Sequence, residues 1–365
     1  MITQTVLNEK YEFVDELGHG AFGVVWGALL RKTREKVALK KITIQMDVAY
    51  LKRLLREILL MKNLRNDNLI LLKDIHMLVG DEFAVYFVME RMSCNLRYLI
   101  QQRNVSFSYR HKKVFMYEIF SGLAYLHYNK IVHRDLKPDN ILISQQDNEI
   151  KIADFGWARK IDKEDDFLTK QISNIHYKAP EICFKTEINW QIDIWAVGCI
   201  FFEILEGKVL FDAAGESILL ELIIKNFGSP SVQEMDFIDN KLVLDWIKNL
   251  GNFPKIQPSR YLECSEIDFL GKDLLDQCLS FNPKNRISAL DALRHPYFAD
   301  IYDKKSIQNR LINHESKIDF LFESDPKIDE KKLIDRILIE ISPPPLIQKK
   351  PQSFLDSVLG FIRNN

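Results

Sequence analysis

The sequence predicts an α+β protein with two lobes, a small β-rich lobe at the N-terminus and a larger α-helical lobe after it. Up to about residue 95, short apolar strands and turns surround a single helical segment. From about residue 96 onward, apolar residues recur at helical spacing instead. The chain of 365 residues is 47% hydrophobic and 28% charged, which is enough apolar material for a large core and argues against global disorder.

The small lobe is expected to contain several strands and one helix. Residues 13–14 lead into a glycine-rich turn, and residues 24–26 lead out of it as the next strand. Residues 37–40 and 85–89 are apolar runs of strand length. Residues 51–64 carry leucine and isoleucine at helical spacing, which predicts the one helix of this lobe.

The larger lobe is expected to be mostly helical, with helices over residues 96–102, 112–128, 193–206, 217–226 and 272–279. The longest apolar run, residues 192–205, overlaps the third of these segments and contains Asp193 and Glu203. It is too short and too charged to span a bilayer, so it is expected to form a buried core helix.

A C-terminal extension, residues 299–365, follows the two lobes. A helix is expected over residues 330–341, and Pro343-Pro344-Pro345 then predicts a stiff, extended connector. Residues 354–362 have an amphipathic pattern. Two alternatives stay open for this extension: it packs on its own protein, or it recruits a partner.

Charge and cysteine content exclude several classes of protein. The formal net charge is −1, so the overall charge does not favour binding to nucleic acid or to an anionic membrane. Its five cysteines are scattered and form no C-x-x-C, which argues against a disulfide framework or zinc site. Residues 1–10 lack the apolar core of a signal peptide. We therefore expect a monomer in the cytoplasm, with the nucleus as the second location.

The stretch from His133 to Asn140 brings a base, a cation and a metal ligand together within eight residues. Asp135 would accept a proton from an alcohol, and Lys137 would neutralise charge on a transferring phosphate. Asn140 and, fourteen residues later, Asp154 offer the hard oxygen atoms that suit Mg²⁺. The combination predicts transfer of a phosphoryl group from ATP to a hydroxyl group.

A glycine-rich turn near the N-terminus follows the pattern G-x-G-x-x-G-x-V, with its glycines at Gly18, Gly20 and Gly23. Glycines allow backbone N–H groups to approach phosphate oxygens closely. A strand is expected after the turn instead of a helix, which disfavours a dinucleotide site. Lys40 follows one hairpin later, where its ammonium would hold phosphates. Glu57, on the predicted helix, would pair with Lys40 and preserve its charge.

With these motifs assembled, the chain resembles the eukaryotic protein kinases over residues 11–298. The resemblance rests on matched motifs along that range: Gly18/Gly20/Gly23, residues 37–40, Glu57, residues 133–140, Asp154-Phe155-Gly156, Ala179-Pro180-Glu181, Asp193 and Arg286. It implies the bilobal protein-kinase fold, with an N-lobe over about residues 11–92 and a C-lobe over residues 93–298. It also implies ATP and Mg²⁺ as cofactors and protein substrates as partners. Lys137 with Asn140 fits serine/threonine specificity.

The resemblance implies a role for each matching residue. Asp135, Lys137, Lys40 and Glu57 would be catalytic, and Asn140 and Asp154 would hold magnesium. Glu181 and Arg286 would form a buried ion pair, and Asp193 would support the catalytic loop. Met89 matches the gatekeeper, and the backbones of Glu90 and Met92 would meet adenine. The full ATP-binding set would be Leu17, Gly18, His19, Gly20, Ala21, Phe22, Gly23, Val24, Val25, Ala38, Lys40, Met89, Glu90 and Met92.

Within the kinases, the chain is most similar to the MAP kinases. Residues 272–283 are close to their large-lobe signature, and residues 318–341 resemble the extension that wraps back onto their small lobe. A cyclin-dependent-type cell-cycle kinase is the alternative, although those kinases usually end soon after the match to Tyr297-Phe298. A pseudokinase scaffold is a third alternative, which the intact Lys40, Asp135, Asn140 and Asp154 disfavour.

The activation loop departs from the MAP-kinase pattern, because Thr169-Lys170-Gln171 stands where that family has Thr-x-Tyr. The three arginines that would receive the phosphate of Thr169 are present as Arg56, Arg134 and Arg159. The two that would receive phosphotyrosine are replaced by Ile175 and Lys178. We therefore expect single-site control through Thr169 by an upstream kinase, or a loop ordered without phosphate. The same replacements put proline-directed specificity in question.

Overall fold

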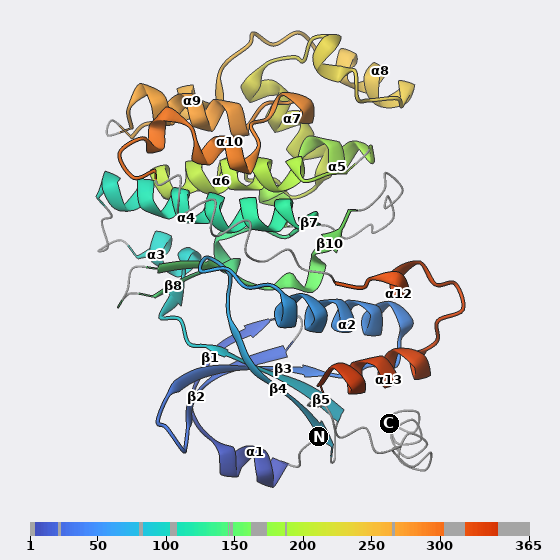
Figure 1. Ribbon diagram of the computed structural model, residues 1–365. Helices are drawn as coiled ribbons and strands as arrows, with labels where there is room; N and C mark the ends of the chain where they lie inside the picture. Colours follow the sequence, from blue (N-terminus) through green and yellow to red (C-terminus); the bar gives the residue numbers. More distant parts are fainter. Residues whose placement is uncertain are drawn as a thin grey trace.

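The computed structural model places a strand-rich lobe below a larger helical lobe, with the C-terminal extension returning to the small lobe (Figure 1). This confirms the predicted α+β fold of two lobes. The described residues are 4–20, 23–79, 83–102, 108–144, 146, 149–161, 174–186, 188–264, 267–302 and 318–341.

The small lobe is built on a five-stranded antiparallel sheet with the strand order β1-β2-β3-β5-β4. One face packs against Leu7 of the short helix α1 (Gln4–Lys10), and the other packs against helix α2. Val88 belongs to the first face and its neighbour Phe87 to the second, because successive side chains of a strand point to opposite faces. The strands are β1 (Tyr11–Gly20), β2 (Gly23–Leu30), β3 (Lys36–Thr43), β4 (Leu72–Val79) and β5 (Phe83–Glu90).

Helix α2 (Val48–Asn63) is the predicted helix of this lobe, and it begins three residues before the predicted start. The earlier start follows from Asp47, whose carboxylate accepts a hydrogen bond from the Tyr50 backbone N–H at 2.7 Å. Its leucines and isoleucine bury a continuous stripe, which fixes the helix against the sheet.

The larger lobe is organised around helix α6 (Gln191–Glu206), in which every residue from Ile192 to Leu205 is buried. The predicted core helix is therefore present. No helix among the described ranges has the length and apolarity needed to cross a membrane. The other helices of this lobe are α3 (Leu96–Gln101), α4 (Tyr109–Tyr128), α5 (Pro180–Phe184), α7 (Glu216–Phe227), α8 (Lys241–Asn249), α9 (Phe269–Cys278) and α10 (Ala289–Leu293).

Short strands at the junction of the lobes carry the motif-bearing loops. They form two small antiparallel sheets, β6-β8-β9 and β7-β10. The segment from His133 to Asn140 connects β7 to β8, and Asp154 comes two residues after the end of β9. The strands are β6 (Cys94–Asn95), β7 (Ile131–Val132), β8 (Ile141–Ser144), β9 (Glu149–Ile152) and β10 (Arg159–Lys160).

The described part of the C-terminal extension packs on its own protein. It contains α12 (Leu321–Ser324) and α13 (Glu330–Ile341), both of which lie beside α2 in Figure 1. Helix α13 buries Leu333, Ile334, Ile337 and Leu338, and Lys62 of α2 donates to Glu340 Oε2 at 2.6 Å. The prolines at 343–345 and the amphipathic stretch 354–362 lie outside the described residues.

Candidate active site

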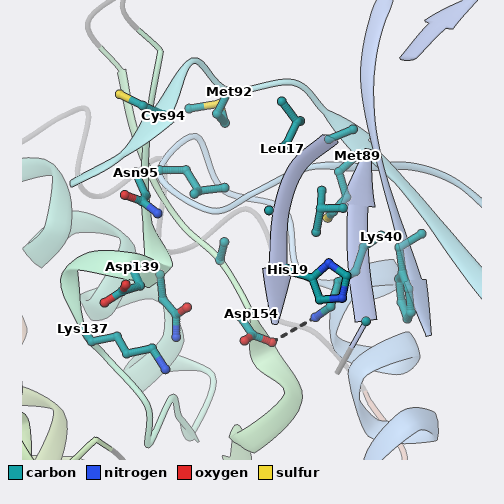
Figure 2. A pocket seen from close by; sticks show the side chains of 18 of the residues that line it. Leu17, His19, Lys40, Met89, Met92, Cys94, Asn95, Lys137, Asp139 and Asp154 are labelled. Carbon is teal, nitrogen blue, oxygen red and sulfur yellow. Dashed lines mark hydrogen bonds and ion pairs between the residues drawn. The ribbon is translucent and has the colours of Figure 1, made fainter. Parts of the chain in front are cut away.

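A cavity of about 570 Å³ lies between the two lobes, and both contribute to its walls. Figure 2 shows Leu17, His19, Lys40 and Met89 of the small lobe facing Lys137 and Asp154 across it. The lining residues that the sequence predicted are Leu17, Gly18, His19, Gly23, Val25, Ala38, Lys40, Glu57, Met89, Met92, Lys137, Asn140 and Asp154. The ATP-binding and magnesium motifs therefore meet in one space.

The hairpin of β1 and β2 forms one wall of the cavity, and Gly20 pairs with Gly23 at its tip. Gly23 has φ +138°, and a Cβ built on it would lie 1.8 Å from the backbone oxygen of Lys41. No side chain fits there, so the glycine is required by both conformation and space. Ala21 and Phe22, which the sequence assigned to ATP binding, lie outside the described residues.

Lys40 holds two carboxylates from different parts of the chain. Its Nζ lies 2.7 Å from Glu57 Oε1 and 3.1 Å from Asp154 Oδ1. The predicted pairing of Lys40 with Glu57 is thus present. Burial alone would lower the pKa of Lys40, but attraction to Asp154 and Glu57 outweighs it and raises the pKa, which keeps the ammonium charged. Burial would raise the pKa of Asp154, but Lys40 overrides it and lowers the pKa to about 2.

Asp193 of α6 fixes the backbone that precedes the proposed base. Its Oδ2 accepts from the His133 backbone N–H at 2.8 Å, and its Oδ1 accepts from the Arg134 backbone N–H at 2.9 Å. His127 Nε2 approaches the same carboxylate at 3.0 Å. Arg134 takes φ +69°, an unfavourable conformation for a non-glycine residue, and these hydrogen bonds hold it there. The predicted support from the core helix is present.

The carboxylate of Asp135 is oriented by two neighbours. Lys137 Nζ donates to Asp135 Oδ2 at 2.8 Å. Asn140 Nδ2 donates to the Asp135 backbone oxygen at 2.8 Å and to Oδ2 at 3.2 Å. The amide nitrogen of Asn140 is thereby engaged with Asp135, and its side-chain oxygen is the atom left to act as a ligand.

The donor set of Asn140 and Asp154 fits magnesium. Both residues line the same cavity, and the low pKa of Asp154 keeps its carboxylate ionised. Magnesium prefers hard oxygen ligands and usually takes one or two from the protein, with phosphates and water completing its octahedron. The described part of the chain contains no metal site formed by three or more His, Cys, Asp or Glu side chains.

Glu181 and Arg286 form the buried ion pair that the sequence predicted. Two guanidinium nitrogens lie 2.5 and 2.8 Å from the two carboxylate oxygens, and the side chains of Arg286 and Glu181 are 0% and 1% exposed. This pair joins the first turn of α5 to the segment between α9 and α10. Nearby, Lys178 Nζ donates to Glu216 Oε1 of α7 at 2.9 Å, so this replacement of a family arginine is held by a carboxylate.

The three arginines assigned to the phosphate of Thr169 come from three elements: Arg56 from α2, Arg134 from the catalytic loop and Arg159 from β10. Arg56 and Arg159 both donate to Glu323 of the C-terminal extension. Sequence reasoning did not anticipate this contact. Thr169 itself lies outside the described residues.

Some predicted site residues are not part of the cavity wall, and several lining residues were missed. Val24, Glu90 and Asp135 are not among the lining residues, although Asp135 is hydrogen-bonded to Lys137 and Asn140, which are. The prediction for Glu90 concerned its backbone, and its carboxylate accepts from the Leu71 backbone N–H at 2.7 Å. Helical spacing could have identified Met61, one turn after Glu57 on α2. The missed lining residues are Met61, Phe87, Ser93, Cys94, Asn95, Asp139, Leu142 and Ala153.

Comparison with known proteins agrees with this geometry. The family model described as "Protein kinase domain" matches residues 11–298. The mitogen-activated protein kinase homolog NTF3 of Nicotiana tabacum is 38% identical over 301 residues, covering 81% of this chain and 80% of that protein. The mitogen-activated protein kinase HOG1 of Debaryomyces hansenii is 37% identical over 304 residues, covering 81% and 76%. Mitogen-activated protein kinase 2 of Arabidopsis thaliana is 36% identical over 302 residues, covering 81% and 79%.

Proposed function

The chain belongs to the protein kinase family as a MAP-kinase-like serine/threonine kinase, and we propose that it transfers the γ-phosphate of ATP with the residues of the cavity between its lobes. The observation that carries this assignment is the meeting of Lys40, Glu57, Asn140 and Asp154 around one space, with Asp135 hydrogen-bonded to Asn140 beside it. ATP would lie between the lobes, with its phosphates near Lys40 and the glycine-rich hairpin.

Each polar residue would contribute a separate part of the transfer. The substrate hydroxyl oxygen bonds to the γ-phosphorus as the bond to the departing ADP oxygen breaks, and Asp135 accepts the hydroxyl proton. Lys40 would hold the phosphates of ATP, and Lys137 would neutralise charge on the group in transit. Asn140 and Asp154 would hold magnesium, which supplies charge neutralisation at the phosphates when it is bound.

The pocket that binds the substrate residue after the phosphorylated position would have a relaxed preference for proline. Ile175 and Lys178 replace two arginines of the family, and Lys178 is held by Glu216. We therefore propose that substrates need no proline at the following position. A peptide library phosphorylated by the purified kinase measures this preference, and a strict Ser/Thr-Pro requirement would contradict the proposal.

Any control by phosphorylation would act at Thr169 alone, by an upstream kinase and without phosphotyrosine. The support is the joint replacement of the family's tyrosine and of its two phosphotyrosine-binding arginines. Mapping of phosphoamino acids in active protein tests this, and activity that depends on phosphotyrosine between residues 157 and 181 is incompatible with it. We also propose a monomer in the cytoplasm, with the nucleus as a second location, which light scattering and imaging of a fluorescent fusion would measure.

The experiment that tests the catalytic assignment is phosphate transfer from Mg-ATP to a general protein substrate. Asp135→Asn should abolish turnover, because it removes the proton acceptor and leaves the shape of the side chain nearly unchanged. The matched control is Asp291→Asn, at an exposed carboxylate on α10, which should leave turnover unchanged. Equal turnover by the Asp135→Asn variant and the wild type would refute the role of Asp135, and absence of turnover in the wild type would favour a pseudokinase scaffold.

A further inference from the structure

A single carboxylate lies between two of the arginines that the sequence assigned to a phosphate. Arg56 Nε donates to Glu323 Oε1 at 2.5 Å, and Arg159 donates to the same oxygen at 3.0 Å. In addition, Lys52 Nζ donates to the Glu323 backbone oxygen at 2.8 Å. Three cationic side chains of the kinase domain therefore converge on one residue of α12.

The two arginines belong to elements that carry the active site. Arg56 directly precedes Glu57 on α2, and Glu57 holds Lys40. Arg159 begins β10, the strand that follows the Asp154 segment. Glu323 therefore connects the helix that carries Glu57 to the segment that carries Asp154, and a displacement of α2 would break both the Arg56–Glu323 and the Glu57–Lys40 contacts.

Burial makes this carboxylate necessary. The Arg56 side chain is 2% exposed and that of Glu323 is 24% exposed. A guanidinium buried this deeply needs an anion beside it, because an uncompensated charge inside a protein is strongly destabilising. The backbone around Glu323 is itself anchored, since the adjacent Phe322 is buried and Arg336 of α13 pairs with Asp319 at 2.6 Å.

We propose that Glu323 is a positioning residue for phosphoryl transfer, whose carboxylate holds Arg56 and Arg159 together and keeps Glu57 against Lys40 without a phosphate group. The proposal rests on the kinase function proposed above. A carboxylate carries one negative charge, whereas a phosphorylated side chain carries about 1.5 to 2. Phosphate on Thr169 would then add to an arrangement that already exists, and the unphosphorylated protein would retain substantial activity.

The test uses the full chain after phosphatase treatment and compares Glu323→Gln with Glu330→Gln. The second variant makes the same change in the same extension, and within the described ranges Glu330 has no ion-pair partner. We expect Glu323→Gln to lower kcat by about tenfold or more and to increase hydrogen exchange in α2. Glu330→Gln should change neither quantity. Glu323→Asp should restore part of the activity, because it returns the charge.

The outcomes separate this inference from the kinase assignment. If wild-type turnover requires Asp135 but Glu323→Gln leaves both kcat and exchange in α2 unchanged, the role of Glu323 is refuted and the kinase assignment stands. If wild-type turnover does not require Asp135, the assignment fails, and exchange in α2 still reports whether Glu323 holds that helix. A loss of kcat that accompanies a lowered unfolding temperature, and that Glu323→Asp does not restore, would show a purely structural role and overturn the proposal.

Discussion

Replacement of Arg286 by methionine should destabilise the larger lobe far more than replacement of a surface arginine. Arg286 neutralises the fully buried Glu181 and also donates to the backbone oxygens of Ser280, Gln191 and Phe281. Removing one partner of a buried pair leaves an uncompensated charge, which costs about 3–5 kcal/mol. That loss is a large fraction of the roughly 5–15 kcal/mol by which folded proteins are stable.

Urea denaturation of the purified variants measures this cost. Arg294→Met is the matched control, because Arg294 and its partner Asp291 are 57% and 63% exposed and lie 3.4 Å apart. It should cost less than about 1 kcal/mol. The double variant Arg286→Met/Glu181→Met should be more stable than Arg286→Met alone, since no unpaired carboxylate remains. A cost below about 1 kcal/mol for Arg286→Met, or a double variant that is less stable still, would refute the reasoning.

Three further predictions concern the cavity. Lys40→Met should lower kcat by about 10²–10³, because the cation that would hold the phosphates is lost, and phosphate transfer from Mg-ATP measures this. Gly23→Ala should destabilise the small lobe by about 1–3 kcal/mol, as thermal unfolding would report, since the new methyl group would meet the Lys41 backbone oxygen. Asp154 has its pKa lowered from 3.8 to about 2, so its contribution to stability is complete above about pH 4 and is lost as the pH falls through about 2. Wild type should therefore lose about 2 kcal/mol more than Asp154→Asn across this range, as measured by urea denaturation.

Each of these predictions has a control and an outcome that contradicts it. Lys41→Met removes the neighbouring cation, and equal kcat values for the two lysine variants would contradict the role of Lys40. Gly18→Ala is the control for Gly23, because nothing lies within 4 Å of the Cβ it would add. Equal destabilisation by the two alanines would show that space at Gly23 is not limiting. Parallel acid profiles for wild type and Asp154→Asn would show that Lys40 does not lower the pKa of Asp154.

The sequence predicted side-chain partners most accurately where a motif places functional residues at a fixed spacing. Lys40, Glu57 and Asp193 were assigned partners from their motifs, and each partner is present at hydrogen-bond distance. Strand β4 was not predicted. Its sequence, from Leu72 to Val79, contains Lys73, Asp74 and His76 and has no clean alternation, and a register shift interrupts its pairing with β5. Pairing with a neighbouring strand stabilises this segment in spite of its weak local pattern.

The contact of Arg56 with Glu323 could not be predicted for a different reason. The two residues are 267 positions apart, and α12 has only four residues, too few to produce a helical pattern. The sequence contains both charges, but only packing of α13 on α2 brings them together. The missed cavity residues Phe87 and Leu142 likewise belong to strands whose apolar patterns indicate burial but do not indicate which face lines the space between the lobes.

Because the catalytic loop is attached to Asp193, the thermal stability of catalysis should equal the thermal stability of the whole fold. Asp193 lies near the start of α6, the helix with the most deeply buried surroundings in the larger lobe, and it is itself 1% exposed. The backbone at His133 and Arg134 cannot leave this carboxylate without exposing buried donors and a buried charge. On heating, enzymatic activity and cooperative unfolding should therefore disappear over the same temperature interval, with no cooler range in which an intact protein has lost its catalytic loop.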